Sequence, residues 1–92
     1  MKKRVAIVGV TGSVGQEFVQ SLDNHPWFEV TQIAASERSA GKMYLDAIRD
    51  PSGIIAWGVS GEIPEYIKSM KVLTVEEVNV QELDLIFSAV ES

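Results

Sequence analysis

Gly9, Gly12 and Gly15 lie at three-residue intervals directly after an apolar run near the start of the chain. A tight turn at the end of a strand needs a residue that is free in φ, and a phosphate group approaches the backbone closely only where a Cβ is missing. A small residue one turn into the next helix also lets that helix pack against the strand. The spacing therefore predicts a strand-to-helix turn that binds phosphate groups.

The segment after the glycines has the pattern of an amphipathic helix. Its apolar residues recur at helical spacing and are Val14, Phe18, Val19 and Leu22. The free amides and the positive dipole end of such a helix attract an anion without any lysine, and the turn has none. The spacing also differs from that of a nucleotide-hydrolysing P-loop. We expect the turn to bind the diphosphate of a dinucleotide; the alternative is that the glycines only shape a tight turn.

Two residues predict how this helix begins. Ser13 and Gln16 have the spacing of a capping box, in which each side chain bonds the backbone amide of the other residue. The helix should end at residues 24–26, because the residue before Pro26 avoids helical backbone angles.

The strand patterns predict the fold class. Residues 5–8 form a continuous apolar run rich in β-branched residues, typical of a strand covered on both faces of a parallel sheet. Residues 28–35 predict a second strand, which completes a right-handed βαβ unit, and residues 85–90 predict another strand suited to the middle of the sheet. We predict an α/β, Rossmann-like fold with a mostly parallel sheet and flanking helices, incomplete, and forming one domain over residues 1–92.

The middle of the chain has weaker patterns. For residues 36–61 we predict no elements, because a loop-like composition is followed by Pro51-Ser52-Gly53. Residues 64–68 predict one helical turn with Pro64 at its first position, and residues 71–73 predict a short strand.

The residues after the second strand indicate which dinucleotide binds. NAD-binding folds usually carry an acidic residue about 20 positions past the glycines, where it holds the ribose hydroxyls. This chain instead has Ser36, Arg38 and Ser39. A guanidinium between hydroxyls suits a 2′-phosphate through charge-assisted hydrogen bonds, so the pattern favours NADP. If Glu37 rather than Arg38 faces the site, NAD would be accepted or preferred, and a solvated loop is the remaining alternative.

Composition and charge exclude several other classes of function. With 92 residues, 46% of them hydrophobic and 23% charged, the chain is typical of a single globular domain. A net charge of -5 without a basic stripe argues against a nucleic-acid partner. The apolar runs are too short to span a membrane, so we expect no membrane partner and a cytoplasmic protein.

The chain contains no cysteine, and His25 is its only histidine. Disulfides, thiolate metal sites and a nucleophile–base relay therefore cannot be built from these residues. His25 stands at the expected helix end, where a histidine commonly bonds a terminal carbonyl. Lys42 and Arg49 are interpreted as solvated side chains, with a phosphate contact as the alternative. We predict no catalytic and no metal-binding residue in this chain.

Four stretches of the chain together resemble the aspartate-semialdehyde dehydrogenases. They are residues 9–16, 25–30, 34–42 and 84–89, and the most specific is Ala-Ala-Ser-Glu-Arg-Ser-Ala-Gly-Lys at 34–42. The resemblance implies that the full-length enzyme uses NADPH to reduce L-aspartyl 4-phosphate to L-aspartate 4-semialdehyde, with release of phosphate, on the route to lysine, threonine and methionine. The acyl phosphate would bind only the full-length enzyme, which we expect to be a homo-oligomer, a dimer or a tetramer.

The resemblance also implies which residues contact the cofactor NADP(H). Those expected at the pyrophosphate are Thr11, Gly12, Ser13 and Val14, within the turn that Gly9 and Gly15 shape. Those expected at the adenosine 2′-phosphate are Ser36, Arg38 and Ser39, and those at the ribose nearer the nicotinamide are Ser88 and Ala89.

The family's catalytic cysteine and histidine lie downstream of the last predicted strand and have no counterpart here. The chain alone should therefore be inactive. After Ser88 and Ala89 the family usually has a proline-containing turn, whereas this chain continues with Val90-Glu91-Ser92.

Other assignments stay open on the sequence alone. Acyl-CoA reductases resemble this family, and N-acetyl-glutamyl-phosphate reductase shares the glycine turn; residues that recognise the acyl group would decide among these enzymes. A non-catalytic NADP-binding module would keep the turn and need no cysteine. A half-domain that binds nothing well is a further alternative, because its exposed sheet edge would favour self-association.

Overall fold

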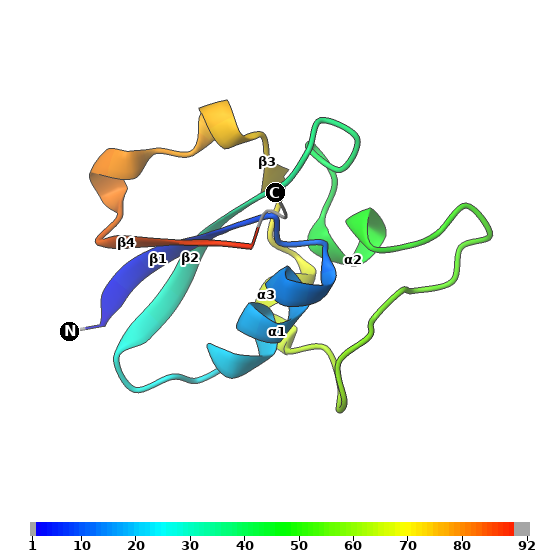
Figure 1. Cartoon of the computed structure of the whole chain (residues 1–92), viewed down its shortest axis with the longest axis horizontal. Coiled ribbons are helices and arrows are strands. Elements are labelled where there is room, and N and C mark those ends of the chain that lie inside the picture. Colours follow the sequence, from blue (N-terminus) through cyan, green and yellow to red (C-terminus); the bar gives the residue numbers. More distant parts are fainter. Residues whose placement is uncertain (1, 90–92) are drawn as a thin grey trace.

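One parallel sheet runs through the protein (Figure 1). The structure is a computed structural model, and it describes residues 2–89. The four strands of the sheet lie in the order β3-β2-β1-β4. They are β1 (Lys3–Val8), β2 (Phe28–Ala34), β3 (Val72–Leu73) and β4 (Leu85–Ser88). All three pairings between neighbouring strands are parallel. The predicted α/β class with a parallel sheet is therefore confirmed.

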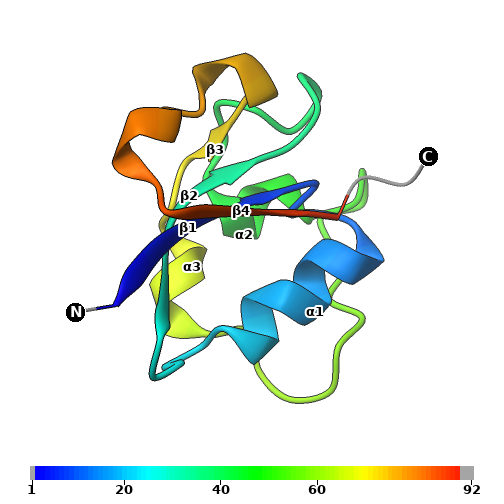
Figure 2. The ribbon, with the colours of Figure 1, turned by 60° about the vertical axis from the view of Figure 1, so that its left-hand side comes forward.

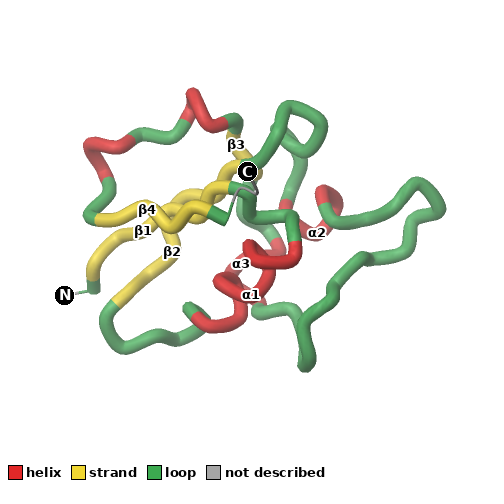
Figure 3. The backbone as a smooth tube through the Cα atoms, viewed as in Figure 1, coloured by secondary structure: helices red, strands yellow, loops and turns green. Residues whose placement is uncertain are grey.

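The helices lie on one face of the sheet and two 3₁₀ turns on the other (Figure 2). The helices are α1 (Ser13–Ser21), α2 (Tyr44–Ala47) and α3 (Glu65–Lys68), and the 3₁₀ turns are η1 (Val75–Glu77) and η2 (Val80–Glu82). Figure 3 shows the segment between α2 and α3 as a long loop that reaches away from the sheet. No helix among residues 2–89 is long and apolar enough to cross a membrane.

The core lies between the sheet and the three helices. Val5 and Ile7 of β1 are fully buried and belong to the same cluster as Val19 of α1 and Ile67 of α3. Ala6, which points to the opposite face of β1, is also fully buried. Burial on both faces explains the continuous apolar run, and each large side chain buried in this way contributes about 1.5–3 kcal/mol.

The predicted capping box at Ser13 and Gln16 is wrong. The N-cap of α1 is Gly12, which has no side-chain cap, and Ser13 is already the first helical residue. Gln16 is buried, and its amide bonds the Thr11 carbonyl and a distant loop at Ala56 and Gly58 instead of the Ser13 amide. A capping box does form at η1, where Thr74 and Glu77 bond each other's backbone amides.

Two further differences concern the later elements. Pro64 precedes α3 as its N-cap and is not its first helical residue. β4 ends at Ser88 and lies at the edge of the sheet rather than in its middle. Leu85 and Ile86 are 44% and 46% exposed, because no strand among the described residues pairs with the outer side of β4. Val90, the predicted end of this strand, lies outside the described residues.

Candidate dinucleotide site

Gly9 and Gly12 lie in the turn between β1 and α1 (Figure 1), and Gly15 lies in the first turn of α1, as their spacing predicts. Gly9 has a φ of 79°, in the left-handed region that glycine adopts without strain. The amides of Gly9 and Val10 both donate to the Ala34 carbonyl at the end of β2, at 2.9 and 3.1 Å. The first glycine therefore lets the chain leave β1 sharply while the turn stays bonded to the sheet.

Gly15 lets α1 pack directly on that turn. A Cβ at this position would lie 2.7 Å from Cα of Val10 and closer still to the carbonyl oxygen of Gly9, and both are backbone atoms that cannot rotate away. A Cβ on Gly12, in contrast, would lie 3.8 Å from the nearest atom, an ordinary contact. The fold thus requires glycine at positions 9 and 15, whereas at Gly12 it leaves an open surface that a ligand can approach.

The amino terminus of α1 offers backbone hydrogen-bond donors, and no acidic residue of its first turn competes for them. The first amides of an α-helix have no partner within the helix, and the first turn of α1 contains no acidic residue. Ser13 and Val14 are both exposed there. Free amides together with the positive end of the helix dipole make this terminus suitable for a phosphate group.

Ser88 and Ala89 lie next to this turn. Val8 pairs with Ser88, and the Ala89 amide donates to the Val8 carbonyl at 2.7 Å. The chain passes from β1 through β2 to β3 on one side, while β4 lies on the other side of β1. In open α/β sheets such a switch in strand order leaves a crevice at the carboxyl ends of the strands, and ligands bind there.

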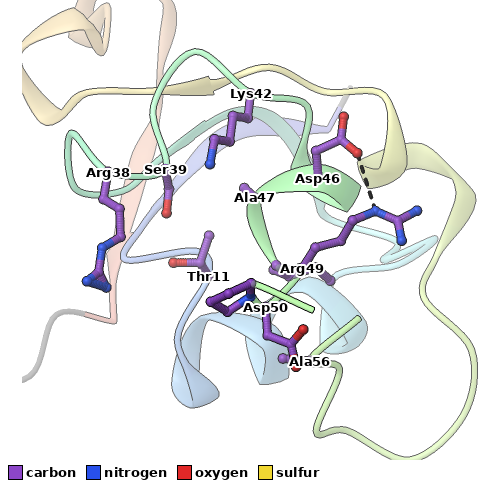
Figure 4. A pocket seen from close by; sticks show the side chains of 11 residues that line it. Thr11, Arg38, Ser39, Lys42, Asp46, Ala47, Arg49, Asp50 and Ala56 are labelled. Atoms are coloured by element: carbon purple, nitrogen blue, oxygen red, sulfur yellow. Dashed lines mark hydrogen bonds and ion pairs between the residues drawn. The ribbon is translucent and has the colours of Figure 1, made fainter. Parts of the chain in front are cut away.

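A cavity of about 720 Å³ opens beside the turn, within the size range of ligand pockets (Figure 4). Three residues predicted to contact the cofactor line it: Thr11, Arg38 and Ser39. The other lining residues are Lys42, Asp46, Ala47, Ile48, Arg49, Asp50, Pro51 and Ala56. The side chains of Ser39 and Lys42 point toward Thr11 in Figure 4.

The charges around the cavity favour an anion. Asp46 forms an ion pair with Arg49, in which Oδ1 lies 3.4 Å from Nε, drawn as a dashed line in Figure 4. Hydrogen bonds from the Ser52 hydroxyl and from nearby backbone amides lower the pKa of Asp50. Arg38 and Lys42 form no ion pair within the part of the chain that the structure describes. The two cations are therefore available to a ligand, while both carboxylates are engaged locally.

The remaining predicted residues lie apart from this cavity. Gly9, Gly12, Ser13, Val14 and Gly15 belong to the turn and the start of α1, Ser88 is the last residue of β4, and Ala89 follows it. Ser36 is exposed and contributes its carbonyl, which accepts from the amides of Ser39 and Ala40 at 2.9 and 3.0 Å. Glu37 is exposed and does not line the cavity.

The sequence patterns did not identify some of the residues that form the site. The wall from Asp46 to Ala56 lies in the stretch for which no element was predicted, because neither a helical nor a strand period is present there. Tyr44 of α2 is fully buried, and its hydroxyl donates to the Val10 carbonyl at 3.2 Å. The sequence indicates a phosphate contact of Lys42 and Arg49 only as the alternative to solvated side chains, and both line the cavity. No group of acidic residues and histidine within residues 2–89 could hold a metal ion.

The parallel sheet with its switch in strand order, the glycine turn and the free helix terminus define a Rossmann-like domain. Comparison with known families gives the more particular assignment. The chain belongs to the semialdehyde dehydrogenase family, whose NAD binding domain matches residues 4–92.

Individual relatives carry the name that the sequence resemblance suggested. An aspartate-semialdehyde dehydrogenase of Methanothermobacter thermautotrophicus is 42% identical over 92% of this chain, and one of Archaeoglobus fulgidus is 39% identical over 100% of it. The crystal structure of aspartate-semialdehyde dehydrogenase with NADP from Candida albicans superposes with a TM-score of 0.83 at 37% identity, over 99% of this chain. The chain spans 22%, 24% and 24% of the length of these three proteins.

Proposed function

We propose that this chain is the cofactor-binding part of an aspartate-semialdehyde dehydrogenase and binds NADP(H). The observation that carries the proposal is the pair of cations, Arg38 and Lys42, which have no ion-pair partner among the described residues and line a cavity beside the glycine turn. A relative of similar fold was solved with NADP. Family, cavity and charge therefore favour the same ligand.

In this proposal the diphosphate lies against the amides of Gly12, Ser13 and Val14. The open surface at Gly12 fits that contact, because a phosphate oxygen would approach to hydrogen-bond distance. Thr11 lies between the diphosphate and the adenosine end of the dinucleotide. At the other end of the turn, Ser88 and Ala89 would contact the ribose nearer the nicotinamide.

The adenosine 2′-phosphate would bind Arg38, with Ser39 and Ser36 supplying further hydrogen bonds. A guanidinium binds a phosphate dianion through charge-assisted hydrogen bonds worth about 1.5–3 kcal/mol each. Lys42, whose side chain points into the same cavity, adds a second positive charge (Figure 4). Glu37 does not line the cavity, and of the two carboxylates that do, Asp46 is paired with Arg49 and Asp50 accepts hydrogen bonds from Ser52 and Ile54.

For the full-length enzyme we propose the reduction of L-aspartyl 4-phosphate to L-aspartate 4-semialdehyde, with NADPH supplying the hydride. The residues of this chain would bind and orient the cofactor, and the catalytic cysteine and histidine would come from outside it. The relatives described above favour this substrate over an acyl-CoA or an N-acetyl-glutamyl phosphate. A cytoplasmic dimer or tetramer belongs to the same proposal and rests on the family resemblance.

Isothermal titration of the chain with NADP⁺ and with NAD⁺ tests the cofactor assignment. We expect NADP⁺ to bind about tenfold or more tightly than NAD⁺, because only NADP⁺ carries the 2′-phosphate. Equal affinities would contradict the role of Arg38. An absence of binding to both dinucleotides would contradict the proposed function as a whole.

A further inference from the structure

Gln16 has an unusual environment for a glutamine. The residue is 5% exposed at the start of α1, and three hydrogen bonds occupy its side-chain amide group. Nε2 donates to the carbonyls of Thr11 and Ala56 at 3.0 and 2.9 Å, and Oε1 accepts from the Gly58 amide at 2.8 Å. Both amide protons are therefore used, and both go to carbonyl groups.

Two of these partners line the same cavity. Thr11 belongs to the glycine turn, and Ala56 belongs to the loop between α2 and α3. A single amide group thus joins the two walls. Because the loop bonds the Gln16 amide at both its nitrogen and its oxygen, the loop fixes the orientation of the side chain that holds the turn.

The bond to Thr11 also determines which atoms of the turn face outward. A planar trans peptide directs its C=O and its N–H to opposite sides. With the Thr11 carbonyl bonded to Gln16, the N–H of Gly12 lies on the other side of this peptide, where it has only a long bond of 3.3 Å to the Gly9 carbonyl. If this peptide rotated, the Thr11 carbonyl oxygen would leave Gln16 and turn toward the exposed start of α1, where an anion is expected to bind.

Resting on the proposed function, we propose that Gln16 is a positioning residue for the dinucleotide. It holds the Thr11 carbonyl toward its own buried side chain, so that this oxygen does not face the diphosphate at the exposed start of α1. The loop at Ala56 and Gly58 braces Gln16 in turn. Loss of the Gln16 amide should therefore weaken every ligand that carries the diphosphate, whether or not it has a 2′-phosphate.

Gln20 provides a matched control one helical turn further along α1. Its Nε2 donates to the carbonyl of Ser60, in the same loop, but it makes no bond to the glycine turn. Replacing Gln20 removes a helix-to-loop bond of the same kind. A comparison of Gln16 with Gln20 therefore separates the orientation of the turn from attachment of the loop.

The experiment uses Gln16→Met and Gln20→Met, since methionine keeps the length of the side chain without its amide. Isothermal titration of each variant with NADP⁺ and NAD⁺ is compared with the unsubstituted chain, and circular dichroism checks folding. For Gln16→Met we expect a loss of about tenfold or more for both dinucleotides, the size of one lost hydrogen-bonded contact to a charged group. For Gln20→Met we expect a change of less than about twofold.

Adenosine 2′-monophosphate distinguishes a local effect from general loosening, because it lacks the diphosphate. Its affinity for Gln16→Met, measured by chemical-shift titration, should stay within about twofold of that of the unsubstituted chain. If Gln16→Met does not fold, Gln16→Asn keeps a polar amide but is one methylene too short to reach all three partners. It should bind both dinucleotides more weakly than the unsubstituted chain.

The outcomes distinguish the two proposals. If the unsubstituted chain binds neither dinucleotide, the proposed function fails. If it binds NADP⁺ and the variants at positions 16 and 20 bind equally well, or if Gln16→Asn binds like the unsubstituted chain, the positioning role of Gln16 is overturned. A parallel loss of adenosine 2′-monophosphate binding would also overturn it.

Discussion

The glycine turn (residues 9–15) and the loop between α2 and α3 (residues 48–64) meet at the same cavity, which the turn lines through Thr11, but different contacts hold them. The turn is bonded to the sheet that precedes it, since the amides of Gly9 and Val10 share the Ala34 carbonyl. The base of the loop is bonded to side chains of α1, a helix about forty residues away in sequence. The turn is thus part of the sheet framework, whereas the loop depends on tertiary contacts.

The largest expected effect is the loss of stability on replacing Gly15, compared with the replacement of Gly53 in the loop. Gly15→Ala should destabilise the protein by at least about 2 kcal/mol, because the new Cβ meets backbone atoms and the roughly 1 kcal/mol gained in helix propensity does not offset that overlap. Gly53→Ala should cost only about 1 kcal/mol, because Gly53 has a positive φ but open space around it. Urea denaturation followed by circular dichroism measures both, and equal losses would remove the difference between turn and loop.

Arg38 lies in the segment after β2, between the turn and the loop. Arg38→Ala should weaken NADP⁺ binding by about 1–3 kcal/mol and leave NAD⁺ binding nearly unchanged, since only NADP⁺ has the 2′-phosphate. Arg4→Ala is the control, because Arg4 lies beside Asp84 at 3.8 Å and does not line the cavity. Titration calorimetry with both dinucleotides gives the result. Equal losses for the two cofactors would exclude a 2′-phosphate contact.

A substitution at Gly12 should affect ligand binding but not the stability of the fold. Gly12→Ala should change the free energy of unfolding by less than about 0.5 kcal/mol, because its Cβ would make only an ordinary contact. The same methyl group should weaken NADP⁺ binding about tenfold, since it occupies the surface that a phosphate would approach. A stable variant with unchanged affinity would show that the diphosphate does not approach Gly12.

The smallest expected effect concerns two tyrosines that bond backbone carbonyls, Tyr44, which is fully buried, and Tyr66, which is partly buried. Tyr44 donates to Val10 of the turn and Tyr66 to Val19 of α1, and burial raises the pKa of both phenols well above the ordinary 10.0. The stability that depends on the neutral phenols is fully present below about pH 10 and is lost as the pH rises above it. Tyr44→Phe should cost about 1 kcal/mol at pH 7 and make the decline above pH 10 less steep. Urea titrations from pH 7 to about pH 11 measure this, and an unchanged slope would contradict it.

The sequence predicted the elements that depend on local patterns. The strands at residues 5–8 and 28–35, the helix after the glycines and the turn itself follow from apolar period and glycine spacing. The edge position of β4 could not be predicted, because an apolar run does not reveal which strands pair with it. The role of Gln16 was also missed, since its spacing from Ser13 fits a capping box, whereas its partners are Thr11, Ala56 and Gly58.

The candidate site was predicted unevenly for the same reason. Arg38 and Ser39 lie in the short segment after β2, which ends at Ala34, so the position of that strand brings them to the carboxyl edge of the sheet. The wall from Asp46 to Ala56 has no period that fixes it, and its conformation depends on contacts such as the bond from Gln16 to Ala56. Local sequence patterns determine the turn and the strands of this site, whereas long-range contacts determine its far wall. The sequence therefore predicts only the first part of the site.

The most direct test of the central claim follows the backbone amides of the chain by NMR during a titration with NADP⁺. If the glycine turn binds the diphosphate and Arg38 the 2′-phosphate, the largest shifts occur at Gly12, Ser13 and Val14, with a second group at Arg38 and Ser39. Largest shifts at the opposite end of the sheet, near Leu22 and Val30, with the turn unaffected, would contradict the account.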